Sequence, residues 1–211
     1  MQEQSMARRI RRESRSTNER GARLRLALAA LSVCAGQATS RAQTGCPLEL
    51  GVLDSGGQQA NLGAYAPELS SDGRYVSFLS NAANLAPGLT NGFMDAYVRD
   101  RVTGKVWLAS VSLTGGDGDA HTTSVARMQT AARIVFESLA RNLVPNDHNA
   151  VPGLPLTGSD IFVRDLPAGP TALVSVSSAG VQGNGSSRQP AWSGNGRFVA
   201  FASDSDRKSV V

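Results

Sequence analysis

The chain has 211 residues, 41% of them apolar and 18% charged, which is enough apolar content for a packed core in one or two domains. The net charge of +4 arises in residues 1–42, which hold nine Arg and three Glu, whereas the rest holds twelve Lys and Arg against fourteen Asp and Glu. Because no basic stripe with interleaved aromatic residues follows this segment, we expect no nucleic-acid partner.

Residues 1–42 have the layout of a secretory signal peptide. An Arg-rich stretch runs to Arg25, the apolar run LALAALSVCAG follows from Leu26 to Gly36, and small residues precede a cleavage position after Ala42. Since a helix needs about 20 apolar residues to cross a bilayer, this run predicts a leader and no transmembrane span. We therefore expect an exported protein, periplasmic or extracellular.

The two cysteines do not predict an internal disulfide. Cys34 lies in LSVC, which loosely resembles a lipoprotein signal, but Val33 stands where a small residue is normal, so lipidation is disfavoured. After cleavage only Cys46 remains, and a single thiol cannot form an internal disulfide. Two interpretations stay open for it, a partner outside this sequence or a free thiol.

An internal repeat is the main signal of the sequence. The segment Ala66–Gly88 reappears as Ser124–Asn146, an offset of 58 in the numbering, and a third copy begins at Gln189. The second halves also match: DAYVRD at Asp95 corresponds to DIFVRD at Asp160, where the offset has grown to 65. The extra residues lie in one stretch, 146–159, so the insertion lengthens one loop and spares the predicted strands.

Each repeat reads as short strands separated by turns. Asp72-Gly73 predicts a tight turn, and strands are predicted over Arg74–Ser80, Ala96–Arg101 and Lys105–Ser112. A strand before Pro67 would complete four per repeat. Four antiparallel strands at a fixed period favour a propeller blade over a β-sandwich with accidental self-similarity or a β-solenoid.

The sequence thus predicts an all-β, antiparallel β-propeller fragment with two blades and the start of a third. A closed propeller needs at least four blades, so we expect a C-terminally truncated chain. The hexapeptide 206–211 matches nothing in the repeats, and we interpret it as a sequencing artefact. The predicted segments are 1–42 (leader), 43–65 (linker or closing strand), 66–123 and 124–187 (repeats), 188–205 (start of the third repeat) and 206–211.

The motifs SSDGRYVSF, SGNGRFVAF, DAYVRD and DIFVRD resemble the TolB-type, WD-repeat-like propeller of exported bacterial proteins. The resemblance covers residues 66–205, and it departs at Thr130 and Ala131, which replace the Asp-Gly turn. It implies a propeller fold but not an activity, because propellers host unrelated functions. We expect a scaffold for a protein or glycan partner, with the N-terminal propeller of a larger secreted hydrolase as the alternative and a calcium-stabilised adhesin as a third hypothesis.

Weak calcium ligands are implied by the same resemblance. In this family the loop before DxFVRD often resembles Asp-Thr-Asn-Gly-x-x-Asp, a set of oxygen ligands that could suit calcium. Here Leu89 occupies the first ligand position, and the insertion stretches the second loop. The competing interpretation is local Asx hydrogen bonding. The candidate residues are Asn91, Asp95, Asp147, Asn149 and Asp160.

We find no catalytic constellation and no cofactor motif in the sequence. The stretch Ser70–Gly73 resembles a sialidase Asp box only with its Gly misplaced. Asp100 and Asp165, each after an Arg at a strand end, are predicted to form a turn or a cross-blade salt bridge. His121 and His148 are expected to be surface residues, without ligands at metal spacing. The oligomeric state is left open.

Overall fold

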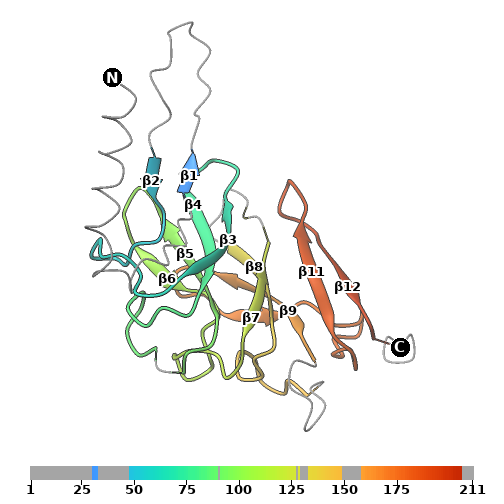
Figure 1. Ribbon diagram of the computed structural model, residues 1–211. Helices are drawn as coiled ribbons and strands as arrows, with labels where there is room; N and C mark the ends of the chain where they lie inside the picture. Colours follow the sequence, from blue (N-terminus) through green and yellow to red (C-terminus); the bar gives the residue numbers. More distant parts are fainter. Residues whose placement is uncertain are drawn as a thin grey trace, which may run out of the picture.

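The computed structural model describes residues 30–32, 48–89, 91–126, 128, 133–148 and 158–205 (Figure 1). Every strand in this part pairs antiparallel, and no helix occurs in it, which confirms the predicted all-β class. Most of the leader, Cys46, Asn149 and the hexapeptide 206–211 lie outside the described residues.

The strands form two four-stranded sheets and two strand pairs. The first sheet contains β3 (Ala64–Leu69), β4 (Tyr75–Ser80), β5 (Asp95–Asp100) and β6 (Val106–Leu108). The second sheet contains β7 (Thr122–Val125), β8 (Arg133–Ser138), β9 (Asp160–Asp165) and β10 (Thr171–Leu173). The third sheet is the pair β11 (Ser187–Trp192) and β12 (Val199–Ser203), and β1 (Ala30–Ser32), within the predicted leader, pairs with β2 (Leu48–Leu50).

The first two sheets are built to the same pattern, at the offsets that the sequence repeat predicts. β4 begins at Tyr75 and β8 at Arg133, which is the offset of 58, whereas β5 begins at Asp95 and β9 at Asp160, which is the offset of 65. In both sheets the strand order follows the chain, and each central pair is in register along six residues. The described residues therefore contain two complete copies of one four-stranded unit, without forming a closed ring.

The first strand of the first sheet differs from the prediction at its proline. The expected strand before Pro67 instead contains it, because β3 has a bulge between Tyr65 and Glu68, where Ala66 adopts a φ of 47°. β11 repeats this bulge beside Pro190, with Gln189 at a φ of 56°. A bulge interrupts the regular ladder where proline has no N–H to donate, so the strand can include it.

The third predicted strand of the repeat, Lys105–Ser112, is shorter than expected. Regular pairing ends at Leu108, and Ser110 then turns its side chain into the sheet, where its Oγ accepts a hydrogen bond from the N–H of Ala96 at 3.1 Å. A side-chain oxygen thus takes the place of a ladder carbonyl, so the backbone leaves the sheet early.

The segment before β3 follows the repeat as well. β2 begins at Leu48 and β6 at Val106, again at the offset of 58. The backbone turn from Asp54 to Gln58 recurs from Ser112 to Gly116 and from Ser177 to Val181, closed by the same N–H to carbonyl hydrogen bond at 2.8 Å. Residues 43–65 are predicted to form a linker or a closing strand. The described part of this segment contains the strand β2 and a loop of the repeat type.

The tight turn predicted at Asp72-Gly73 is present between β3 and β4. Gly73 has a φ of 70°, a left-handed conformation that favours glycine, and its N–H donates to the carbonyl of Ser70 at 2.9 Å. The Ser70 hydroxyl donates to Asp72 at 2.5 Å and accepts from the N–H of Tyr75 at 2.8 Å. The stretch that resembles an Asp box therefore braces a turn.

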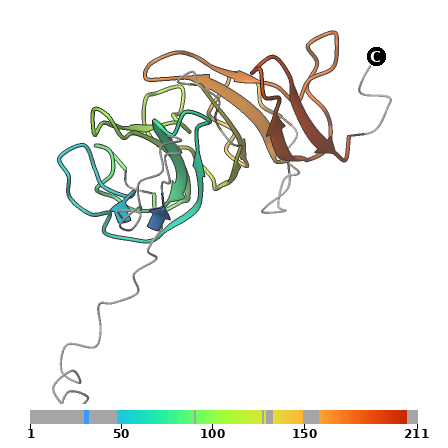
Figure 2. The ribbon, with the colours of Figure 1, turned by 90° about the horizontal axis from the view of Figure 1, so that it is seen from above.

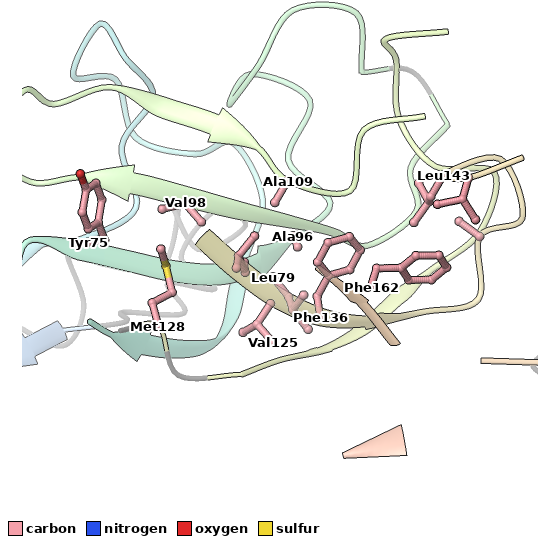
Figure 3. Packing of buried hydrophobic residues seen from close by; sticks show 13 residues of the cluster. Tyr75, Leu79, Ala96, Val98, Ala109, Val125, Met128, Phe136, Leu143 and Phe162 are labelled. Carbon is pink, nitrogen blue, oxygen red and sulfur yellow. The ribbon is translucent and has the colours of Figure 1, made fainter. Parts of the chain in front are cut away.

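The core lies between the sheets. Leu79 and Val98 of the first sheet pack against Ile134, Phe136 and Phe162 of the second, all of them buried (Figure 3). Figure 2 shows the first sheet in teal and green and the third in red, on opposite sides of the second. Apolar side chains facing one another across adjacent sheets supply the burial that a single sheet could not provide.

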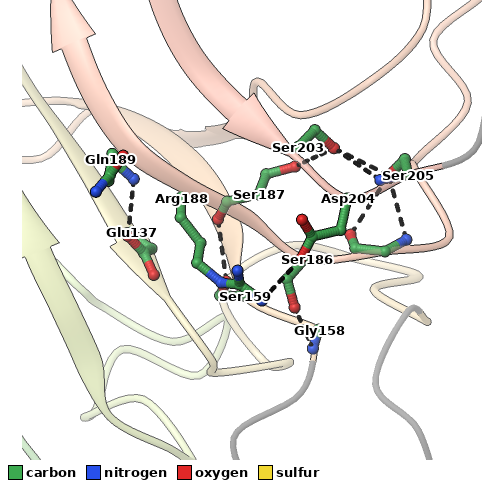
Figure 4. A network of polar contacts seen from close by, with 11 residues as sticks. Glu137, Gly158, Ser159, Ser186, Ser187, Arg188, Gln189, Ser203, Asp204 and Ser205 are labelled. Atoms are coloured by element: carbon green, nitrogen blue, oxygen red, sulfur yellow. Dashed lines mark hydrogen bonds and ion pairs between the residues drawn. The ribbon is translucent and has the colours of Figure 1, made fainter.

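The contact between the second and third sheets is more polar. Glu137, which takes the place of Leu79 at the offset of 58, is 7% exposed and accepts a hydrogen bond from the N–H of Gln189 at 3.1 Å (Figure 4). Ser159 and Ser187 exchange two further hydrogen bonds across the same junction, at 2.6 and 3.0 Å. The third sheet is thus held partly by directional bonds to its bulged strand.

Candidate functional site

A candidate site lies at one edge of the first sheet. β4 ends, β5 begins and β6 ends at this edge, so the loops 81–94 and 109–121 emerge together there; we call it the loop edge. A pocket of about 190 Å³ opens between these loops, and we call it the Asp95 pocket. Its lining includes the side chains of Leu62, Leu89, Phe93, Asp95, Tyr97 and Asp117.

Asp95 is the buried carboxylate of this pocket. Its side chain is 3% exposed, and its Oδ1 accepts a hydrogen bond from the Ser110 hydroxyl at 2.7 Å. Burial raises the pKa of Asp95 to about 6, against the hydrogen bond from Ser110, and the negative charge of Asp117 raises it further. Near neutral pH the pocket therefore favours a proton or another positive group beside Asp95.

Asn91 shapes the loop above Asp95. Its backbone N–H donates to Asp117 Oδ2 at 3.2 Å, and its Nδ2 donates to the carbonyl of Gly118 at 2.5 Å. Its Oδ1 accepts from the N–H of Phe93 at 2.9 Å, which is the Asx hydrogen bond that competed with the calcium interpretation. Asn91 therefore ties the two loops of the loop edge together.

His121 positions the aromatic wall of the pocket, a role that the sequence did not indicate. Its Nδ1 accepts a hydrogen bond from the N–H of Met94 at 2.9 Å, and its ring meets Phe93 edge-on, with centroids 5.0 Å apart. Thr122 donates its N–H to the Met94 carbonyl at 2.7 Å. The half-buried His121 thus fixes the loop from which Phe93 projects, whereas His148 is exposed.

The corresponding place in the second sheet is occupied by a glutamine. Asp160, equivalent to Asp95, accepts from the Ser175 hydroxyl at 2.5 Å, as Asp95 does from Ser110. The Nε2 of Gln182 donates to Asp160 at 2.8 Å and to Asp147 at 2.7 Å, and its Oε1 accepts from the N–H of His148 at 3.1 Å. Burial raises the pKa of Asp147, and the hydrogen bond from Gln182 opposes that rise.

Two positions distinguish the sites of the two sheets. Gln182 corresponds to Asp117 at the offset of 65, and Asp147 corresponds to Leu89 at the offset of 58. The first sheet therefore places a carboxylate and an apolar side chain where the second sheet has an amide and a carboxylate. Sequence reasoning did not single out Asp117 or Gln182, although extending the alignment of the second halves past Ser110 would have paired them.

The described calcium candidates lie at two places, one in each four-stranded sheet, as their two loops predict. Asn91 and Asp95 line one pocket, Asp147 and Asp160 share Gln182 in another, and Asn149 lies outside the described residues. Among the described residues no group of three or more His, Cys, Asp and Glu side chains is arranged to hold a metal ion.

Asp100 and Asp165 form ion pairs within their own sheets, so a cross-blade salt bridge is the wrong interpretation. Arg74 Nη2 lies 2.8 Å from Asp100, and Arg133 pairs with Asp165. Asp100 also accepts from the N–H of Val102 at 2.9 Å, which matches the alternative prediction of a turn. The Arg74 guanidinium lowers the pKa of Asp100 to about 2.

Comparison with known proteins gives a likeness to solved structures alone. No family model matches the chain, and no curated protein matches it. Among solved structures, a TolB candidate from Agrobacterium tumefaciens is similar with a TM-score of 0.37 and 16% sequence identity, over 67% of this chain and 43% of that one. The chain thus spans less than half the length of that structure.

The described part of the present chain contains no apolar helix of membrane-spanning length.

Proposed function

We propose that the chain is part of an exported β-propeller that serves as a scaffold for a protein or glycan partner. The observation that carries this proposal is the stacking of equivalent sheets at the offsets of the sequence repeat, with apolar faces buried between neighbours. Antiparallel sheets that repeat in this way are the blades of propellers, and each neighbour covers a face that a lone blade would expose.

The loop edge is the part of this scaffold that would meet a partner. Loops that leave rigid strands are the usual place for recognition residues. In the first sheet these loops enclose the Asp95 pocket, and Leu62 at its rim is 52% exposed. An apolar rim around a polar floor is the composition of a binding pocket more than of a structural loop.

Binding of the purified chain to peptide and glycan arrays tests the scaffold proposal. We expect saturable binding to one ligand class, weakened by Leu62→Ser at the loop edge. The matched control is Val102→Ser, since Val102 is also exposed, at 75%, but follows β5 at the opposite edge. Absence of saturable binding on both arrays, or equal loss in both variants, would contradict the proposal.

The alternative is that this segment precedes the catalytic part of a larger secreted hydrolase. Sequencing the gene beyond codon 211 separates the two: a downstream Gly-x-Ser-x-Gly motif favours the hydrolase, and further repeats alone favour the scaffold. Export has its own test. The protein recovered from a secreting bacterial host should begin at Gln43, and an uncleaved Met1 would contradict the leader assignment.

A further inference from the structure

We propose that the leader masks a strand-binding edge of β2. β1, which belongs to the leader, lies beside β2 in the place that the third strand takes in the two complete sheets (Figure 1). Removal of the leader opens this place to a strand of the repeat. The inference rests on the proposed export, because it takes residues 1–42 as a leader that is removed from the exported protein.

β2 corresponds to the fourth strand of the repeated unit. It begins 58 positions before β6, and a loop with the same closing hydrogen bond follows β2, β6 and β10. β6 and β10 each end their sheet and pair on one side only, with the third strands β5 and β9. In the part of the chain that the structure describes, β2 also has one partner, and that partner is β1.

The pairing of β1 with β2 has the register of a third strand with a fourth. Three consecutive residues are paired at equivalent positions and in antiparallel direction in each case: residues 97–99 with β6, residues 162–164 with β10, and β1 with β2. A shift of one residue changes which groups meet, and pairing by itself leaves the register open. The common register therefore indicates that β1 stands in for a third strand.

The backbone groups that β2 offers to a partner follow from its equivalent in the first sheet. Val106 donates its N–H away from β5, to the Ser55 hydroxyl at 2.9 Å. Since successive residues of a strand direct their backbone groups to opposite edges, the N–H and carbonyl of Trp107 face β5. Glu49 corresponds to Trp107 at the offset of 58, so its N–H and carbonyl face β1.

The two complete sheets identify the strand that fits this edge. β5 and β9 share the pattern Asp-x-aromatic-Val-Arg-Asp, and the aromatic residue, Val and Arg lie opposite the fourth strand. β1 brings Ala30, Leu31 and Ser32 to these positions. In strand addition the main-chain hydrogen bonds supply affinity and the side chains supply specificity. A strand of the repeat pattern is therefore a better partner for β2 than the leader.

The occupant of the opened edge is the third strand of a further repeat. β5 and β9 do not supply it, because each is already paired on both sides within its own sheet. Masking also has a use before export. An uncovered strand edge pairs readily with other chains, and β1 keeps the β2 edge covered until the leader is removed.

Hydrogen exchange at the Glu49 amide, followed by NMR on the full chain, tests the masking. The amide should be protected in the parent chain and should exchange about tenfold faster or more in Leu31→Pro, which removes the N–H at the middle of β1. Leu31→Val keeps this N–H and is the matched control, so it should retain the protection. Equal exchange in the parent chain and Leu31→Pro would overturn the inference.

A capped peptide with the sequence of residues 159–166, SDIFVRDL, tests the partner. It should restore protection of the Glu49 amide in Leu31→Pro and in the secreted chain that begins at Gln43, and it should change nothing in the parent chain. The same peptide N-methylated at its valine keeps every side chain but lacks the N–H that meets Glu49, so it should restore nothing. Because the readout is the Glu49 amide, binding of the peptide at another strand edge does not imitate the result.

Equal effects of the two peptides would exclude a third strand as the occupant and overturn the inference. Equal exchange in the parent chain and Leu31→Pro, in a protein that is secreted with Gln43 as its first residue, would refute the masking and leave the proposed export standing. Exchange that differs as expected, in a secreted protein that still begins at Met1, would contradict the proposed export, while the pairing of β1 with β2 stands.

Discussion

The charge on Asp95 should make the protein less stable at neutral pH than in mild acid. The pKa of Asp95 is about 6 in the folded chain against an ordinary value of 3.8. The folded state therefore holds the proton more tightly, and the stability that this proton contributes is fully present below pH 4 and lost as pH rises through 6. A difference of about 2 pKa units corresponds to about 3 kcal/mol.

Asp95→Asn removes this ionisation and keeps an oxygen that can accept from Ser110. We expect the variant to be more stable than the parent chain by up to about 3 kcal/mol at pH 7.5, with little difference at pH 4. Urea unfolding at several pH values between 4 and 7.5 measures the difference. Groups with lowered pKa values, such as Asp100, contribute equally to both proteins, so the comparison isolates Asp95.

The reasoning is refuted if Asp95→Asn is destabilised at pH 7.5, or if the difference between the two proteins is the same at both ends of the range. Glu68→Gln provides the control for a general loss of negative charge, because Glu68 is only half-buried in β3. If Glu68→Gln stabilises the chain at pH 7.5 as much as Asp95→Asn does, the effect belongs to net charge and not to the buried carboxyl of Asp95.

Three further changes test the packing. Phe136→Ala should lower the free energy of unfolding by about 3–5 kcal/mol in urea denaturation, because Phe136 is fully buried and stacks on Phe162. The control Phe198→Ala should have almost no effect, since Phe198 is 63% exposed. Similar losses in the two variants would disprove the core assignment. Glu137→Leu should leave the N–H of Gln189 without its acceptor and speed hydrogen exchange in β11 by about tenfold or more, and unchanged exchange would show that this bond does not hold the third sheet. Arg74→Ala should lower the free energy of unfolding only slightly at neutral pH, because Arg74 is exposed to solvent. It should move acid unfolding to higher pH as Asp100 loses its partner, and an unchanged acid midpoint would contradict the ion pair.

The sequence predicted the parts of the fold that depend on local chemistry. Asp72-Gly73 predicts its turn because glycine accepts the left-handed conformation, and the alternation from Arg74 to Ser80 predicts β4 because its side chains pack on both faces. The strand was predicted before Pro67, but its continuation through the proline was not, since a bulge is set by pairing with β4 and not by the local pattern.

The candidate site was only half predictable for the same reason. Asp95 and Asp160 stood out because they begin a repeated motif. Asp117 and Gln182 lie in a weakly patterned loop, and their importance comes from the return of that loop to the start of β5 or β9. The loop after the last strand of a sheet lies beside the start of the third strand because of the strand order. The residue pattern of a single strand carries no information about that order.

One loop residue differs between the two sheets, Asp117 in the first and Gln182 in the second, and this difference shows how such a molecule can diversify. The sheets share their turns, their core positions and their Asp–Ser pair, while the residue that faces this Asp is free to be Asp117 in one copy and Gln182 in the next. Duplication of the unit would therefore multiply pockets without altering the framework. Selectivity could then be revised one copy at a time, by substitutions that leave the interfaces between copies untouched.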